Sequence, residues 1–407
     1  MALGTITKVI KWRVVVSGLK SNTYKGMHEL NMLSDTILII SQSDPIMPSG
    51  STSVALLQNG LLARHFRTEL SYPKGVTPLT SMPRRHYAIA TWVLRLIQSL
   101  VQFEGVVYII DYTRVGLLTI VVKKVFHRPY RVVNYFGQNN PGPATPKFSL
   151  SHPIFAHFFG AFFSTVIKHS DGVIVNPVDS LVSFVRVRAR SFATIPGVLI
   201  DTNVVNRHEL AAARIRKELG LGNRPLVGLV GPFHDWNRPS IDFVRRNSGL
   251  FEPEISFMFI GKYSRGDSFT DERVIFVGHV EDFVDYLSAC DCLLVPRLAR
   301  FGGPMNKMVY AMAIGLPVVT NNPEGMSVTN GENVILSQLS DLPREVNRLI
   351  QNPGLKEAIG RNARMYVEEN YSANANEEKL VSYIGGFMTS KSRGGELRVH
   401  SSRETQT

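Results

Sequence analysis

The sequence predicts two α/β domains, each a doubly wound parallel sheet covered by helices. Three observations indicate this class. Apolar runs of strand length alternate with helical stretches, which is typical of parallel sheets with crossover helices. Several of these runs end at a glycine, as expected where a strand turns toward a ligand at its carboxyl end. With 407 residues, the chain is long enough for two domains with separate cores.

In the first half, a glycine-containing loop follows the first expected strand. Gly50 and Ser51 lie in this loop, which leads into a helix from about Ser53. A long Gly/Pro loop covers residues 137–153, and loops of this length are more often functional than idle. The expected strands of this half are Thr36–Ser41, Val106–Ile110, Val132–Phe136 and Gly172–Val175.

The second half repeats the pattern with five expected strands. Each ends at a residue that breaks a strand, namely Gly231, Gly261, Gly278, Pro296 or Asn321. In parallel sheets, ligands bind beyond such carboxyl ends. The strands are Leu226–Val230, Ser256–Ile260, Val274–Val277, Cys292–Val295 and Pro317–Thr320.

Domain boundaries follow from a short hinge and a polar tail. Pro196-Gly197-Val198 is a plausible hinge, so we expect a first domain over residues 1–195 and a second over 196–363. A helix over 364–385 is expected to pack back toward the first domain. The remaining residues, 386–407, are polar and basic and are expected to be disordered.

The first half carries all the excess positive charge of the chain. Residues 1–195 hold 21 Lys/Arg against 8 Asp/Glu, a net of +13, whereas residues 196–407 hold 24 against 25. The chain shows none of the sequence motifs of nucleic-acid-binding modules, so no nucleic-acid partner is expected. Neither a signal peptide nor an apolar run of membrane-spanning length is visible. The two cysteines, Cys290 and Cys292, lie in an apolar run and are expected to be buried thiols.

The basic first half is expected to meet an anionic membrane surface. Arg84, Arg85 and Arg95 lie among aromatic and aliphatic residues, and Lys123 and Lys124 end an apolar helix. Basic flanks beside an apolar face suit interfacial docking. Alternatively, these helices cover a sheet and expose ordinary solvated faces. We therefore expect a cytoplasmic, peripherally membrane-associated protein.

Residues 301–319 are the stretch that is most informative about function. Gly302 and Gly303 precede a helix opened by Pro304 and closed by Gly315. The unpaired N–H groups at such a helix start, with its dipole, can hold a phosphate, and Lys307 would add a full charge. The alternative is an ordinary buried crossover helix.

Five stretches match, in order, the pattern of one enzyme family. They are His169–Val175, Ile195–Asp201, Leu229–Gly231 with Arg238, Phe276–Val280 and Lys307–Val319. On these stretches the chain resembles the retaining glycosyltransferases of family 4, the glycosyl transferases group 1, over about residues 35–385. The resemblance implies a GT-B architecture, in which two Rossmann-like domains face each other across a cleft.

The resemblance also implies a reaction and indicates which domain would bind each substrate. A nucleoside-diphosphate sugar, the co-substrate in place of any cofactor, would be held by the second domain. A lipid-linked or growing glycan acceptor would be held mainly by the first. Transfer would be metal-independent, with Arg238 and Lys307 stabilising the leaving diphosphate and Asp111 as the candidate cleft carboxylate. Gln138 and Asn139 are the acceptor candidates. The donor-binding candidates are Gly50, Ser51, Gly231, Lys262, His279, Val280, Gly302, Gly303, Asn306, Tyr310 and Glu324.

Several positions depart from the family pattern. Gly302 and Tyr310 stand where the family has two glutamates, so contact to sugar and ribose must be weaker or rearranged. Pro232 replaces an arginine that often follows the first-loop glycine. Glu324 is either a substitute for a lost glutamate or a solvated loop residue. These losses leave two alternatives open: a catalytically impaired partner subunit or membrane scaffold, and an epimerase acting on the nucleotide sugar.

Overall fold

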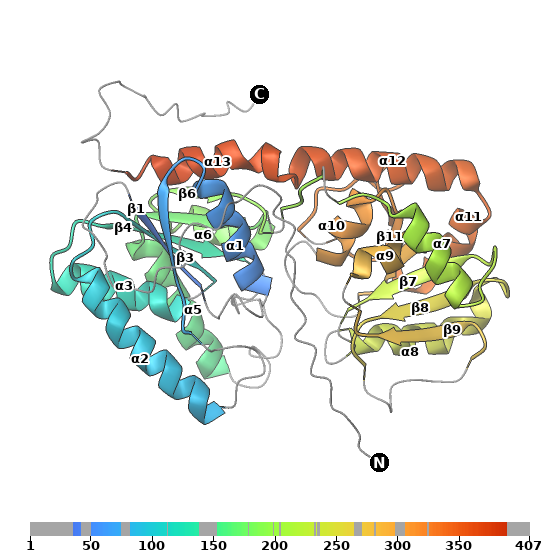
Figure 1. Cartoon of the computed structure of the whole chain (residues 1–407), viewed down its shortest axis with the longest axis horizontal. Coiled ribbons are helices and arrows are strands. Elements are labelled where there is room, and N and C mark those ends of the chain that lie inside the picture. Colours follow the sequence, from blue (N-terminus) through green and yellow to red (C-terminus); the bar gives the residue numbers. More distant parts are fainter. Residues whose placement is uncertain are drawn as a thin grey trace, which may run out of the picture.

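The computed structural model describes residues 36–41, 50–74, 82–111, 113–137, 153–177, 179–197, 199–202, 205–231, 233, 237–263, 271–280, 282–297, 306–323 and 325–388. These residues form two lobes, each built on a six-stranded sheet (Figure 1). Every strand pairing is parallel, as the alternation of strands and helices predicts. No described helix has the length and apolarity to cross a bilayer.

The first sheet has the strand order β2-β1-β3-β4-β5-β6. Its four expected strands are present, and two further strands lie at its edges. Neither edge strand carries a continuous apolar run, because one side of an edge strand is left without a neighbour and is partly exposed. The strands are β1 (Thr36–Ile40), β2 (Arg67–Ser71), β3 (Val106–Ile110), β4 (Arg131–Phe136), β5 (Gly172–Val175) and β6 (Phe192–Thr194).

Helices cover both faces of this sheet. One face packs against α2 (Met82–Leu100), α3 (Thr113–Val125), α5 (Pro153–His169) and α6 (Asp179–Arg186) around a shared apolar core. The opposite face packs against α1 (Gly50–Leu62) and the last helix of the chain, α13 (Ala373–Gly385). The C-terminal segment is therefore part of the first lobe's core.

The second sheet has the order β12-β11-β10-β7-β8-β9. All five expected strands are present, and the short edge strand β12 is additional. The strands are β7 (Leu226–Val230), β8 (Ser256–Ile260), β9 (Val274–Gly278), β10 (Cys292–Val295), β11 (Val318–Thr320) and β12 (Ile335–Leu336). Cys290 and Cys292 are buried free thiols beside and within β10, as predicted.

Two helical layers sandwich this second sheet. One layer comprises α7 (Glu209–Glu218), α9 (Phe283–Ser288), α10 (Asn306–Ala313) and most of α12 (Pro353–Asn370). The other comprises α8 (Arg238–Asn247) and α11 (Leu342–Ile350), with short 3-10 turns at Ser248–Leu250 and Leu339–Asp341. The predicted helix start at Pro304 lies outside the described residues.

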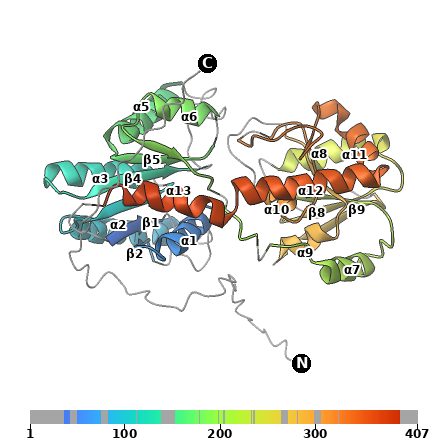
Figure 2. The same ribbon diagram turned by 90° about the horizontal axis from the view of Figure 1, so that it is seen from above.

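The last two helices run across both lobes (Figures 1 and 2). Position 364, an expected boundary, lies inside α12, and the break between α12 and α13 falls at Tyr371 and Ser372. There the linker residue Ile200 donates its N–H to Tyr371 O and accepts from Ala373 N, at 2.8 and 2.9 Å. The two crossings of the chain between lobes are thus hydrogen-bonded to each other.

A close backbone approach holds α12 against the end of α10. A Cβ added at Gly360 of α12 would lie 2.3 Å from the carbonyl oxygen of Gly315, whereas one at Gly354 of the same helix would meet only Asn352 Oδ1 at 3.6 Å. We expect Gly360→Ala to lower the free energy of unfolding by about 1–3 kcal/mol through overpacking. Gly354→Ala, the matched control, should be neutral or slightly stabilising because alanine favours helix. Urea denaturation of both variants measures this; equal stabilities would contradict it.

Candidate functional site

Three glycine turns meet at the carboxyl edge of the second sheet. Gly231, Gly261 and Gly278 follow or end β7, β8 and β9, with φ angles of 149°, 137° and 74° that disfavour L side chains. Gly231 N donates to Ile260 O at 3.0 Å, and Gly261 N donates to Gly278 O at 2.7 Å. A Cβ at Gly261 would lie 2.0 Å from the oxygen of Gly231. Only a glycine at position 261 lets the backbones at the ends of β7 and β8 approach so closely.

The start of α10 is fastened to this edge by Lys307. Its Nζ donates to Val230 O, at the end of β7, and to Asn237 Oδ1, at 2.8 and 2.7 Å. Burial, together with the positive charge of Arg297, lowers the pKa of this ammonium to about 7. Asn237 is the N-cap of α8, and its side chain makes no capping hydrogen bond. Lys307 therefore ties three elements together at the glycine turns.

The other described donor candidates surround the same edge. Arg238, Lys262, His279 and Asn306 have exposed side chains at the ends of β8 and β9 or the starts of α8 and α10. Val280 is partly buried against the core. Gly302, Gly303 and Glu324 lie outside the described residues, as do the acceptor candidates Gln138 and Asn139. Gly50 and Ser51 open α1 in the first domain, but their side chains are not described.

Tyr310 packs where the family resemblance places a glutamate. Its ring meets Phe283 edge-on, with centroids 5.1 Å apart. Burial, and to a smaller degree the carboxylate of Asp282, raises the pKa of the Tyr310 hydroxyl, so this group stays protonated at neutral pH. Tyr310 can offer one hydroxyl and an aromatic edge, but it has no carboxylate to accept two hydrogen bonds.

In the first domain, Asp111 lies at the carboxyl end of β3. It is only 5% exposed, and its φ of 51° places it in the left-handed region. Gly137 N, just after β4, donates to Asp111 Oδ1. Burial raises the pKa of Asp111 to about 7, although the Gly137 N–H opposes this shift. Asp111 is therefore poised between its acid and base forms near neutral pH.

A hydrogen-bonded junction lies at the end of β5. It was not predicted from the sequence. Asn176, directly after β5, accepts from Tyr135 Oη at 2.9 Å and from Gly197 N. A Cβ at Gly197 would lie 2.2 Å from Tyr135 Oη, so the interdomain glycine is needed for this contact. The only signal in the sequence was the position of Asn176 at a strand end, beside the predicted hinge.

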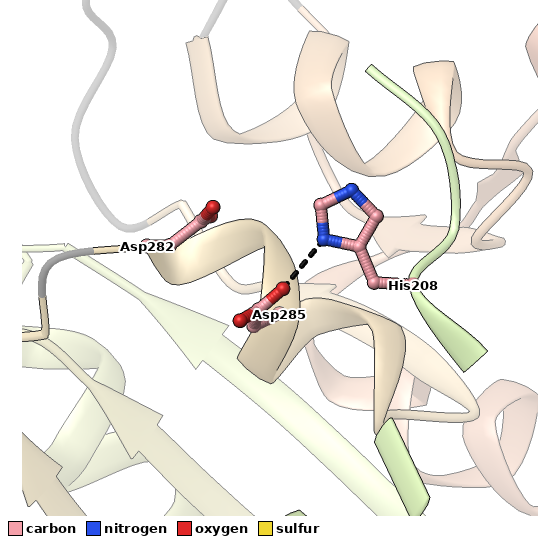
Figure 3. A group of neighbouring side chains, drawn as sticks. All are labelled: His208, Asp282 and Asp285. Atoms are coloured by element: carbon pink, nitrogen blue, oxygen red, sulfur yellow. Dashed lines mark hydrogen bonds and ion pairs between the residues drawn. The ribbon is translucent and has the colours of Figure 1, made fainter. Parts of the chain in front are cut away.

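One group of described side chains could hold a metal ion. Ligand atoms of His208, Asp282 and Asp285 all lie within 4.8 Å of one another at the start of α9 (Figure 3). His208 Nδ1 already shares a hydrogen bond with Asp285 Oδ1, and Asp282 caps α9 by accepting from Val284 N at 2.9 Å. Arg214 lies 3.8 Å from Asp285 and would oppose a cation. Protein partners thus account for this arrangement.

Two doubly wound parallel domains joined by crossing C-terminal helices define the GT-B fold, as predicted. A solved structure of Anabaena HepE in complex with UDP superimposes on this chain with a TM-score of 0.66 and 16% identity, covering 86% of this chain and 100% of that one. The HepE complex with UDP-glucose gives a TM-score of 0.65, 17% identity, and coverage of 86% and 99%.

The predicted resemblance to the glycosyl transferases group 1 is confirmed, because residues 224–352 match the family model of that description. CapM of Staphylococcus aureus, a capsular polysaccharide biosynthesis glycosyltransferase, is 28% identical over 121 residues, which cover 28% of this chain and 31% of CapM. Spore coat protein SA of Bacillus subtilis strain 168 is 25% identical over 228 residues, covering 49% of this chain and 59% of that protein. Both alignments span less than two thirds of the relative.

The raised pKa of Asp111 has a consequence for stability. Between about pH 4 and 7 the folded protein keeps a proton that the unfolded carboxyl has lost, so stability decreases as pH rises through 7. We expect the free energy of unfolding of the wild type to fall by about 3 kcal/mol relative to that of Asp111→Asn between pH 5 and 8. Urea denaturation across this range measures the difference.

Asp171→Asn provides the control for that series. Burial raises the pKa of Asp171, but hydrogen bonds from Lys123, Val132 N and Arg131 outweigh it and lower the pKa overall. The difference in free energy of unfolding between Asp171→Asn and the wild type should therefore stay constant between pH 5 and 8. A constant difference for Asp111→Asn as well would contradict the prediction.

Proposed function

We propose that this protein transfers a sugar from a nucleoside-diphosphate donor to a lipid-linked or growing glycan acceptor. The observation that carries this proposal is the edge formed by Gly231, Gly261 and Gly278, beside the start of α10. These three positions carry no side chain, and the starts of α8 and α10 beside them present helix N-termini to an anion. This edge also lies within residues 224–352, the part that matches the family model.

A nucleoside diphosphate suits this edge chemically. The structures of HepE contain UDP and UDP-glucose, which makes UDP the first donor moiety to test. We place the diphosphate between the Gly231 turn and the start of α10. Arg238, the exposed first residue of α8, would pair with a phosphate oxygen from the other side of the turn.

Catalysis would then be mainly electrostatic. Cleaving the sugar–phosphate bond builds negative charge on the leaving diphosphate, and each well-placed donor contributes about 3 kcal/mol to the transition state. The family resemblance supplies the proposed retention of configuration. The proposed transfer requires no metal ion. Asp111, on the first domain, is the proposed acid–base group on the acceptor side, with its pKa near 7 suited to proton transfer.

We further propose that the first domain docks on the cytoplasmic face of an anionic membrane to reach a lipid-linked acceptor. The helices on one face of its sheet expose large apolar side chains: Tyr87 and Leu94 on α2, and Val121, Val125 and Phe126 at the end of α3. Exposed Arg95 and Lys124 lie beside them in sequence. Apolar side chains with flanking cations favour insertion at an anionic interface.

Not every predicted docking cation is available. Lys123 Nζ donates to Asp171 Oδ2 at 2.7 Å, and the Lys123 side chain is only 23% exposed. This ion pair stabilises the fold and leaves Lys123 less accessible to a membrane. Arg84 and Arg85 lie on α2, but their side chains are not described. The surface that we test is therefore the one formed by Tyr87, Leu94, Arg95 and Lys124.

Donor binding is tested by thermal shift with a panel of nucleoside diphosphates and nucleotide sugars. A ligand at about 100 times its Kd should stabilise the wild type by about 2.7 kcal/mol, a rise of several degrees in Tm. Arg238→Ala should weaken binding of the best nucleotide at least tenfold. Arg246→Ala, near the other end of the same helix, is the control and should bind normally. No shift with any nucleotide would refute donor binding and favour the scaffold alternative.

Membrane docking is tested by co-sedimentation with vesicles that contain 30% anionic phospholipid. The wild type should pellet, and the variant Leu94→Ser/Arg95→Gln/Lys124→Gln should lose at least two thirds of its binding. Leu210→Ser/Lys217→Gln, on the exposed face of α7 in the second domain, is the matched control. Equal pelleting of the wild type and both variants would refute this docking surface.

A further inference from the structure

Lys307 is turned toward the protein and not toward the open edge where a diphosphate would bind. Both hydrogen bonds of its Nζ go to protein oxygens, Val230 O and Asn237 Oδ1. These acceptors belong to the end of β7 and the start of α8, the two elements joined by the Gly231 turn. The contacts therefore fasten both ends of the turn to the start of α10.

Gly231 and Asn237 pack against each other beside these hydrogen bonds and leave no room for a side chain at position 231. A Cβ at Gly231 would lie 2.7 Å from Asn237 Nδ2, so the Asn237 amide packs directly on the glycine. Gly261 packs on the other side, with its Cα hydrogen facing the Gly231 oxygen closely enough to exclude a side chain. A shift of Asn237 would thus disturb both the Gly231 backbone and the start of α8.

We propose that Lys307 is a positioning residue that holds the Gly231 turn through Asn237, and that it takes up a proton when a nucleoside diphosphate occupies the turn. The proposal rests on the donor site proposed above. A neutral amine has two N–H bonds, which match the two acceptors observed. An ammonium has a third N–H, which finds no acceptor among the described residues, and a diphosphate brought to the turn would favour the charged form electrostatically.

The charges around Lys307 support this coupling. Burial, together with the positive charge of Arg297 two residues after β10, keeps the pKa of Lys307 near 7 in the free protein. Arg238 on α8 is exposed beside Asn237 and has the same sign. Val230 and Asn237 present neutral groups. No described carboxylate acts on Lys307, so the diphosphate would be the group that raises its pKa.

Calorimetric titration with UDP at pH 8 tests the proposal, because the phosphates of UDP are then already ionised. Titrations in HEPES and in Tris, which differ in ionisation enthalpy, give the number of protons taken up. We expect about 0.5–1 proton per UDP bound for the wild type. Lys307→Arg should keep the contacts and the charge, and should bind UDP with no uptake. Lys356→Met, which removes a lysine paired with Asp291 at 2.8 Å, is the control and should match the wild type.

A ligand-free measurement separates this inference from the proposed function. Because the pKa of Lys307 is lowered by folding, the unfolded chain holds a proton that the folded one has released, and stability rises with pH between 7 and 9. Lys307→Met should abolish that rise. If UDP binds and the wild type and Lys307→Arg take up equal numbers of protons, the proposal is wrong. If stability rises between pH 7 and 9 but no nucleotide binds, the proposed donor site and its coupling to Lys307 are both wrong. The result would still support a buried, neutral Lys307 in the folded protein.

Discussion

The close packing of three backbone turns is the constraint on which the second domain's site depends. Gly231, Gly261 and Gly278 end neighbouring strands, and the oxygen of Gly231 occupies the space that a side chain at position 261 would need. This packing links the three strand ends by backbone hydrogen bonds, from Gly231 N to Ile260 O and from Gly261 N to Gly278 O. The start of α10 is then added to the edge by the two hydrogen bonds of Lys307.

The first domain depends in turn on close contacts with the interdomain linker and with the last two helices. Gly197 closes on Tyr135 and Asn176 at the end of β4 and β5, and a few residues later Ile200 pairs with the break between α12 and α13. Glu377 on α13 then accepts hydrogen bonds from Arg64 and shares another with His65, both just after α1. The linker, the final helices and the first sheet therefore form one connected junction, and Asp111 lies beside it with a carboxyl group that burial keeps half-protonated near neutral pH.

Much of the fold was predictable from the sequence, but the site was predictable only in part. All nine expected strands are present. Eight of them are central strands, which are buried and read as continuous apolar runs, and the ninth, β9, is an edge strand that keeps an apolar run although it is only partly buried. Edge strands β2, β6 and β12 escaped notice because partial exposure removes that signal. The glycine ends of β7, β8 and β9 were also visible. The roles predicted for Arg238, Lys307 and Asp111 as catalytic residues remain predictions, and those for Gln138, Asn139, Gly302, Gly303 and Glu324 fall outside the described residues.

By itself, the sequence determined the alternation of strands and helices, the places where strands end in glycine, and the family that the second half resembles. These are local properties, because apolar periodicity and backbone freedom are written in neighbouring residues. Only the tertiary structure decided that Lys307 reaches Asn237, 70 residues away in the chain, and that Asn176 receives both Tyr135 and Gly197. Such contacts depend on how strands are ordered in a sheet, which sequence spacing does not encode. The shifted pKa values of Lys307 and Asp111 follow from the same cause, because burial is a property of the assembled fold.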